Sequence, residues 1–164
     1  MKKLTIVIMS AIALIASFTP LQAQAKGDAG KGEKTLGLMG GFATYNSGGF
    51  MNLYFQYTFI PHIRIAPEIG YVFRNEGKSA FEMSVDMHFP FRIVRGFHVY
   101  PLIGVTFNNW NYSNDGSASR VGGNIGAGFD IYMTSYLKLT LQGKYSIMND
   151  TDGGFFGLGI GYVF

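Results

Sequence analysis

The sequence predicts an all-β fold: an eight-stranded antiparallel up-and-down barrel that crosses a membrane with its strands. Three observations predict it. Eight runs of about ten residues alternate large apolar with small or polar side chains, which is the period of a β-strand. Apart from Lys34, which begins the first run, the charges inside these runs all share one parity, opposite to the large apolar residues. The final run, 153–164, alternates apolar residues with glycine and ends on Phe164, which suits a closed barrel in lipid because a soluble sheet would leave such an edge exposed.

The N-terminal segment 1–25 has the features of a cleaved signal peptide. Lys2 and Lys3 precede an uncharged apolar run at 4–18, and Ala23 and Ala25 form a small-x-small cleavage pattern. The alternative is an anchor that stays attached, but the apolar run is short for a spanning helix. The chain has no cysteine, which excludes a lipidated-cysteine anchor and disulfides. We expect a flexible lead-in at 26–33 and a single barrel domain at 34–164.

Turn-forming residues divide the barrel domain into eight expected strands. An even number of strands places both chain ends on the same side of a membrane. The strands are expected at 34–45, 50–60, 63–73, 79–91, 97–110, 120–133, 137–147 and 153–164.

The parity pattern predicts which side chains face the lumen. Apart from Lys34 at the start of the first strand, the charged residues of the strands lie opposite the bulky apolar set. A narrow eight-stranded barrel cannot enclose the bulky set, so we expect that set to face lipid, and not to form the core of a soluble barrel or sandwich. A helical membrane protein is the other alternative, but the uncharged stretch 35–63 has a period of two and is interrupted at 46–49 and Pro61. The expected lumen ionic network is Arg64, Glu68, Glu82, Asp86, His88, Arg120, Asp130, Lys138 and Lys144.

Hairpin geometry brings some of these groups together. Folding about 74–78 places Arg64 opposite His88 and Asp86, while the turn at 134–136 lets Asp130 approach Lys138. Glu68 is expected opposite Ser84. Paired carboxylates can perform acid–base chemistry, but four acidic and four basic residues in a narrow lumen must neutralise one another in any case. We therefore expect a structural network that plugs the barrel, with no catalytic residue.

Aromatic residues are expected to form girdles at the two membrane interfaces. One girdle comprises Tyr57, Phe59, Phe89, Phe91, Phe97, Tyr162 and Phe164. The other comprises Tyr45, Phe50, Phe73, Phe81, Trp110, Tyr112 and Tyr145.

Signal peptide, alternating strands, short turns and a terminal phenylalanine together resemble the small eight-stranded outer-membrane β-barrel family, of the OmpX and OmpA membrane-domain type. The resemblance implies a monomer in the outer membrane of a Gram-negative-type cell, with both termini periplasmic and loops 46–49, 74–78, 111–119 and 148–152 outside. It implies contact with outer-membrane lipid and lipopolysaccharide, and a structural or surface-interaction role. Gly159, Tyr162 and Phe164 match the insertion signal that the barrel-assembly machinery recognises, whereas Gly157 departs from its usual polar residue.

Two other functions remain open. One is a lipid A-modifying barrel enzyme, deacylase- or acyltransferase-like, because 143–150 resembles the His-x-Ser region of a lipid A deacylase. Lys144 stands where the histidine base would be, and a protonated amine accepts protons poorly. None of His62, His88 and His98 lies near a serine in a suggestive spacing. The other is a narrow pore for small solutes, which unpaired lumen charges would favour.

Other functional classes have little support. Without residues 1–25 the chain keeps 11 of its 13 basic residues and all 10 of its acidic residues. It is then close to neutral, and no basic patch indicates nucleic-acid binding. The glycines of 122–128 lack the following helix of a dinucleotide site. His88 and His98 lack a third metal ligand, and the aspartates of 149–153 are better explained as an acidic turn than as a calcium site. We expect no cofactor and no metal.

Overall fold

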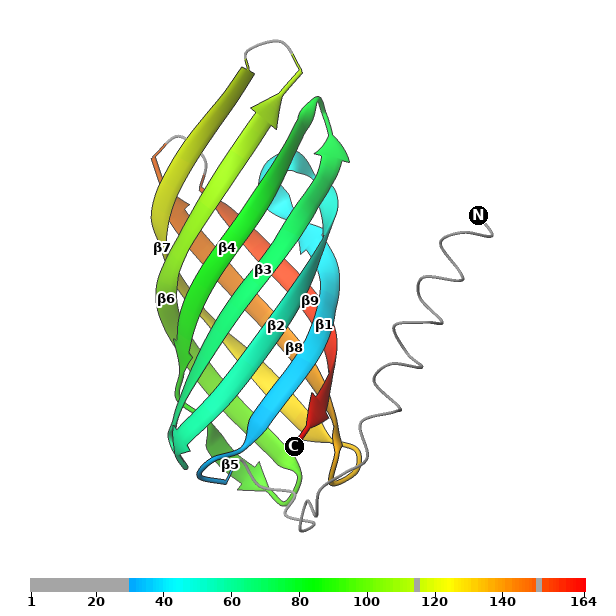
Figure 1. The fold of residues 1–164 in the computed structure, drawn as a ribbon, viewed down its shortest axis with the longest axis vertical. Helices are drawn as coiled ribbons and strands as arrows, with labels where there is room; N and C mark the ends of the chain where they lie inside the picture. Colours follow the sequence, from blue (N-terminus) through cyan, green and yellow to red (C-terminus); the bar gives the residue numbers. More distant parts are fainter. Residues whose placement is uncertain (1–29, 114–115, 150–151) are drawn as a thin grey trace, which may run out of the picture.

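The computed structural model describes residues 30–113, 116–149 and 152–164. The predicted signal peptide with Ala23 and Ala25, and residues 26–29 of the lead-in, lie outside the described residues. Within them the chain forms nine strand segments and one short 3-10 turn (Figure 1). The strands are β1 (Lys34–Ala43), β2 (Gly48–Ile60), β3 (Ile63–Asn75), β4 (Lys78–His88), β5 (Phe91–Val94), β6 (Phe97–Tyr112), β7 (Gly116–Tyr132), β8 (Leu137–Met148) and β9 (Gly153–Val163).

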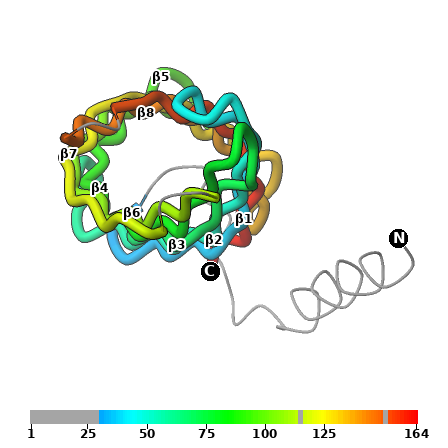
Figure 2. Tube along the Cα trace, turned by 90° about the horizontal axis from the view of Figure 1, so that it is seen from above, coloured from blue at the N-terminus to red at the C-terminus, as the bar shows by residue number. Residues whose placement is uncertain are grey.

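The strands close into an antiparallel barrel, as Figure 2 shows from above. Neighbours in the sheet follow the order β4-β3-β2-β1-β9-β8-β7-β6-β5, and β4 also pairs with β6, which closes the ring. Because β4 and β5 both pair with β6, they occupy one position in the wall. The predicted eight-stranded up-and-down barrel is therefore confirmed. None of the described residues forms a helix long and apolar enough to cross a membrane.

Both ends of the described barrel meet at one rim. Lys34 N–H donates to the Phe164 carbonyl at 3.1 Å, and Phe164 N–H donates to the Lys34 carbonyl at 2.9 Å. We call this rim the terminal end, and the opposite rim, which carries the 3-10 turn Thr44–Asn46 and the β3–β4 turn, the hairpin end. The β6–β7 hairpin projects furthest at the hairpin end (Figure 1).

Several strand boundaries differ from the sequence prediction. The expected strand 79–91 is interrupted at Phe89–Pro90, because proline has no backbone N–H to donate to the ladder. The first strand ends at Ala43, and residues 44–46 form the 3-10 turn. The segment 111–119, expected as a loop, is mostly strand, because β6 continues to Tyr112 and β7 begins at Gly116.

The parity prediction is confirmed. Met83 and Val105, which have the apolar parity, are 48% and 60% exposed. Glu82 and Lys144, which have the opposite parity, are only 1% and 4% exposed. Burial alternates in this way along β4 and β8. The apolar side chains form the outer surface, and the ionic residues are enclosed.

Part of the expected aromatic girdle lies inside the barrel instead. Phe50 and Trp110 are buried, Tyr45 is half-buried, and all three pack in one cluster with Phe155. The Tyr45 ring lies 4.4 Å from Trp110 and 5.3 Å from Phe155, centroid to centroid. The girdle prediction is wrong for these residues, since Phe50 and Trp110 have the lumen parity of their strands. Phe73, Phe81 and Tyr145 are exposed as expected.

Glycine makes room for the larger lumen side chains. A Cβ at Gly128 would overlap the Tyr100 ring, and one at Gly37 would overlap the Tyr54 ring. Both tyrosines are buried. Glycines on the lumen parity of β1 and β7 therefore allow two aromatic rings to cross a narrow interior.

Candidate functional site

The centre of the lumen is organised around one lysine. Lys144 of β8 places its Nζ 2.9 Å from Glu68 Oε2, 3.1 Å from Glu82 Oε1 and 3.5 Å from Asp86 Oδ2. It also donates to Ser84 Oγ at 3.0 Å. All four ionic side chains are at least 94% buried. This group, the Lys144 cluster, thus has three carboxylates around one ammonium.

Neutral polar groups complete part of this cluster. Gln142 donates to Glu68 Oε1 at 3.2 Å, and Asn124 donates to Asp86 Oδ1 at 2.8 Å. Glu82 differs, because neither of its carboxylate oxygens accepts a hydrogen bond from the described residues. Glu82 therefore depends on its ion pair with Lys144.

A second cluster, nearer the terminal end, is centred on Asp130. Arg64 Nη1 donates to Asp130 Oδ2 at 2.6 Å, and Thr140 donates to Asp130 Oδ1 at 2.8 Å. Arg64 Nη2 lies 3.0 Å from His88 Nδ1, and its guanidinium lies 4.8 Å from the centroid of the Tyr100 ring. The His88 ring stacks on the same tyrosine, with centroids 4.5 Å apart.

Lys138 joins this Asp130 cluster to the rim. Its Nζ lies 3.9 Å from Asp130 Oδ2 and 3.6 Å from Glu33 Oε1, and it donates to Gln56 Oε1 at 2.7 Å. Tyr132 donates to Glu33 Oε1 at 2.7 Å. Glu33 was not predicted as a network member. Residues 30–33 form a turn whose Gly32 N–H donates to the Thr58 carbonyl at 2.7 Å, and this turn brings Glu33 to the lumen.

The hairpin-level predictions are confirmed where they concern neighbouring strands. Arg64 pairs in register with His88, and Glu68 pairs with Ser84. The Lys138–Asp130 approach is also present. The expected proximity of Asp86 to Arg64 is not among the observed contacts: Asp86 instead contacts Lys144 across the lumen.

Arg120 occupies a different position from the other predicted network members. It lies on β7 opposite Asn108 of β6 and is half-buried.

The aromatic cluster covers the lumen at the hairpin end. Asn108 donates to the Tyr45 hydroxyl at 3.0 Å, so the cluster is tied to the polar interior below it. Burial, and secondarily the nearby Glu82 carboxylate, raises the pKa of Tyr45 above its ordinary range, so its phenol stays neutral. The space between this cluster and Lys144, bounded by Phe50 and Phe155, is too small for a water molecule.

The geometry gives little support to chemistry on lipid. Lys144 and Ser146 both face the lumen; Lys144 is surrounded by carboxylates, and Ser146 donates to Asn124 Oδ1 at 2.7 Å. A lysine in such ion pairs is a poor general base. Among the described residues, no three His, Asp or Glu side chains are arranged to hold a metal ion. What the arrangement does chemically is neutralise charge inside a narrow barrel.

A closed barrel with an apolar exterior and an ionic interior defines an integral β-barrel membrane protein. The model of the outer membrane protein beta-barrel domain family matches residues 11–164. The chain therefore belongs to that family and is a protein of the outer membrane, where it contacts lipid.

Solved outer-membrane barrels share the fold. The N-terminal barrel domain of Pseudomonas aeruginosa OprF superposes with a TM-score of 0.72 at 19% identity, covering 82% of this chain and 99% of that one. Ail, the attachment invasion locus protein of Yersinia pestis, superposes with a TM-score of 0.60 at 20% identity, covering 82% of this chain and 99% of that one. Neisserial surface protein A superposes with a TM-score of 0.65 at 12% identity, covering 84% of this chain and 97% of that one. A search of curated protein sequences finds no significant match.

Proposed function

We propose that the chain is a non-enzymatic, monomeric outer-membrane barrel whose lumen is closed by its own side chains. Its role is then structural or one of surface interaction, performed by the outer wall and the two rims. The observation that carries this proposal is the Lys144 cluster. Its side chains cross the lumen from β3, β4 and β8, and the space above it is too small for water.

Planar-bilayer recording tests the closed lumen. The purified, refolded barrel is expected to give no steady conductance, because ions have no continuous aqueous path through the paired side chains. Steady, large ion currents from a preparation that is folded by gel mobility would overturn the proposal and favour the pore. Glu76→Gln, which alters an exposed turn residue, serves as the control and is expected to be equally silent.

Mass spectrometry of lipid A tests the absence of enzymatic activity. Lipid A from cells that express the protein is expected to match that from cells without it. A change in acyl number or length would establish the enzyme alternative instead.

The proposed orientation places the terminal end in the periplasm. Outer-membrane barrels have short periplasmic turns and longer extracellular loops, and the furthest-projecting hairpin, β6–β7, lies at the other rim (Figure 1). An epitope inserted at Gly77 is expected to bind antibody on intact cells, and one inserted at Gly96 only after the outer membrane is opened. The reverse result would invert the orientation.

Insertion into the membrane is proposed to use the last strand. Gly159, Tyr162 and Phe164 would be recognised by the barrel-assembly machinery, and lipopolysaccharide would contact the outer half of the wall. Deleting Phe164 is expected to lower the folded fraction in the outer membrane, while refolding in detergent stays near normal. Equal loss in both settings would assign Phe164 to barrel stability instead.

A further inference from the structure

A row of small residues crosses the outer wall of the barrel. Pro67 of β3 pairs in register with Val85 of β4, Val85 with Val105 of β6, and Val105 with Gly123 of β7. All four have the outward parity, and Val105 and Gly123 are exposed. The row therefore forms a depression that runs from one strand to the next.

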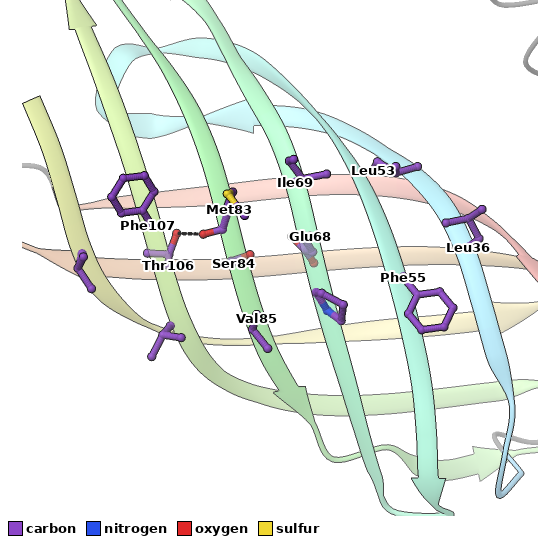
Figure 3. Close-up of a pocket in the computed structure, with 13 residues that line it drawn as sticks. Leu36, Leu53, Phe55, Glu68, Ile69, Met83, Ser84, Val85, Thr106 and Phe107 are labelled. Carbon is purple, nitrogen blue, oxygen red and sulfur yellow. Dashed lines mark hydrogen bonds between the residues drawn. The ribbon is translucent and has the colours of Figure 1, made fainter. Parts of the chain in front are cut away.

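Larger side chains stand on both sides of this row. Ile69, Met83 and Phe107 form the neighbouring row toward the hairpin end and are themselves in register, as Figure 3 shows. The row on the other side consists of Ile65, Met87, Ile103 and Ile125. A groove of about 450 Å³ lies along the small row and the Ile69 row, and Leu36 and Phe55 border it at one end.

The groove runs obliquely toward the terminal end. Pro67 lies near the terminal end of β3 (Ile63–Asn75), whereas Val105 lies near the middle of β6 (Phe97–Tyr112). Beyond Pro67 the groove reaches Phe55, whose register partner on β1 is Leu36. Two residues before Leu36 is Lys34, an exposed cation with the same outward parity. A positive charge thus stands at rim level just past the mouth of an apolar groove.

These features define the occupant. Four strands about 4.8 Å apart give the groove a length of about 15 Å, and no outward side chain in its rows offers a hydrogen bond. An empty groove in hydrocarbon would lose dispersion contacts along its lining. A second barrel presents a convex wall that would leave the groove unfilled, whereas one flexible acyl chain fills it. The cation at the mouth matches a phosphate headgroup.

We propose that this groove is a binding site for one acyl chain of a phospholipid in the leaflet at the terminal end, with the lipid phosphate at Lys34. That the lipid is a phospholipid, and not lipopolysaccharide, rests on the proposed periplasmic location of the termini. The site makes one wall of the barrel a selective lipid contact.

Val105→Phe is the variant that tests the groove. Val105 lines the groove and is 60% exposed, so the larger side chain occupies groove volume without disturbing the lumen. Ile147→Phe is the matched control, because Ile147 is also an exposed outward residue, on β8, and does not line the groove. Both variants are expected to fold.

Native mass spectrometry of the full barrel measures lipid retention after partial delipidation, with phosphatidylglycerol, diacylglycerol and lipid A as the added probes. The wild type and Ile147→Phe are expected to retain one phosphatidylglycerol. Val105→Phe displaces about two methylene groups of the acyl chain from the groove and lowers retention about tenfold. Lys34→Gln lowers it by up to about fivefold, and diacylglycerol, which lacks the phosphate, is insensitive to that change.

Equal retention by Val105→Phe and the wild type would overturn the groove as the site. Preferred retention of lipid A would overturn the assignment to phospholipid. Neither outcome affects the bilayer recordings, so failure of this inference is distinguishable from failure of the closed lumen.

Discussion

Replacing Lys144 with methionine removes the ammonium that contacts Glu68, Glu82 and Asp86 at 2.9, 3.1 and 3.5 Å. Methionine is close to lysine in length but carries no charge. Removing one partner of a buried ion pair costs about 3–5 kcal/mol, because the remaining charge is left uncompensated. Here three carboxylates lose their cation together, so we expect Lys144→Met to lower the free energy of unfolding by the upper part of that range, about 4–5 kcal/mol.

The assay uses the single tryptophan, Trp110, which is 1% exposed inside the aromatic cluster. Its emission should shift to the red when urea unfolds the barrel in lipid vesicles. The midpoint is expected to fall for Lys144→Met and to stay near that of the wild type for Lys78→Met, which removes an exposed lysine. Adding Glu82→Gln to Lys144→Met should recover part of the loss, since one uncompensated carboxylate is removed.

An unchanged midpoint for Lys144→Met would show that the three carboxylates do not need the lysine. Should the variant fail to fold at all, the partial recovery of folded protein by the added Glu82→Gln is the decisive comparison.

Three further changes test other parts of the barrel. Arg64→Met breaks the buried 2.6 Å ion pair with Asp130 and is expected to cost about 3 kcal/mol in urea unfolding, the lower end of the same range, because Lys138 still lies 3.9 Å from Asp130 Oδ2. Leu141→Lys places a charge on the lipid face near the middle of β8 and should cost about 2–4 kcal/mol in vesicles. Gly128→Val drives a side chain into the Tyr100 ring and should lower the thermal midpoint through overpacking of about 1–3 kcal/mol.

Each of these changes has a control on the same molecule. Arg74→Met removes an arginine that donates to Ser113 on the exposed surface, and little loss is expected. Tyr136→Lys, in the turn before β8, should cost no more than about 1 kcal/mol. A Cβ at Gly40 makes an ordinary contact with the Phe50 carbonyl at 3.6 Å, so Gly40→Ala should be neutral. A variant no less stable than its control would contradict the corresponding assignment.

The fold was predictable from the sequence because strand parity is a local property. Met83 and Glu82 are adjacent in sequence and point to opposite faces, so alternation alone separates lipid from lumen. It was harder to predict which large residues near the rim point into the lumen, because this depends on whether small residues on the neighbouring strands leave room for them. Trp110 lies inside because its register partners on both neighbouring strands, Ala80 and Ala118, are alanines.

The residues of the ionic network could be predicted from the sequence, but only some of the contacts between them could. Contacts between adjacent strands follow from the turns, as with Arg64 and His88. Contacts across the lumen depend on how far the closed sheet is staggered, which no local pattern encodes. The pairs of Arg64 with Asp130 and of Lys144 with Asp86 belong to this class. Glu33 was missed because its role depends on a turn before the first strand.

The direction of the apolar parity is the claim on which the account depends, and a nitroxide at Val105 tests it most directly. The chain has no cysteine, so Val105→Cys can be labelled at one site in vesicles. We expect collisions of the nitroxide with dissolved oxygen to exceed those with a water-soluble nickel chelate, as for a probe among acyl chains. A nitroxide that is shielded from both relaxants, or that collides mainly with the chelate, would contradict the account.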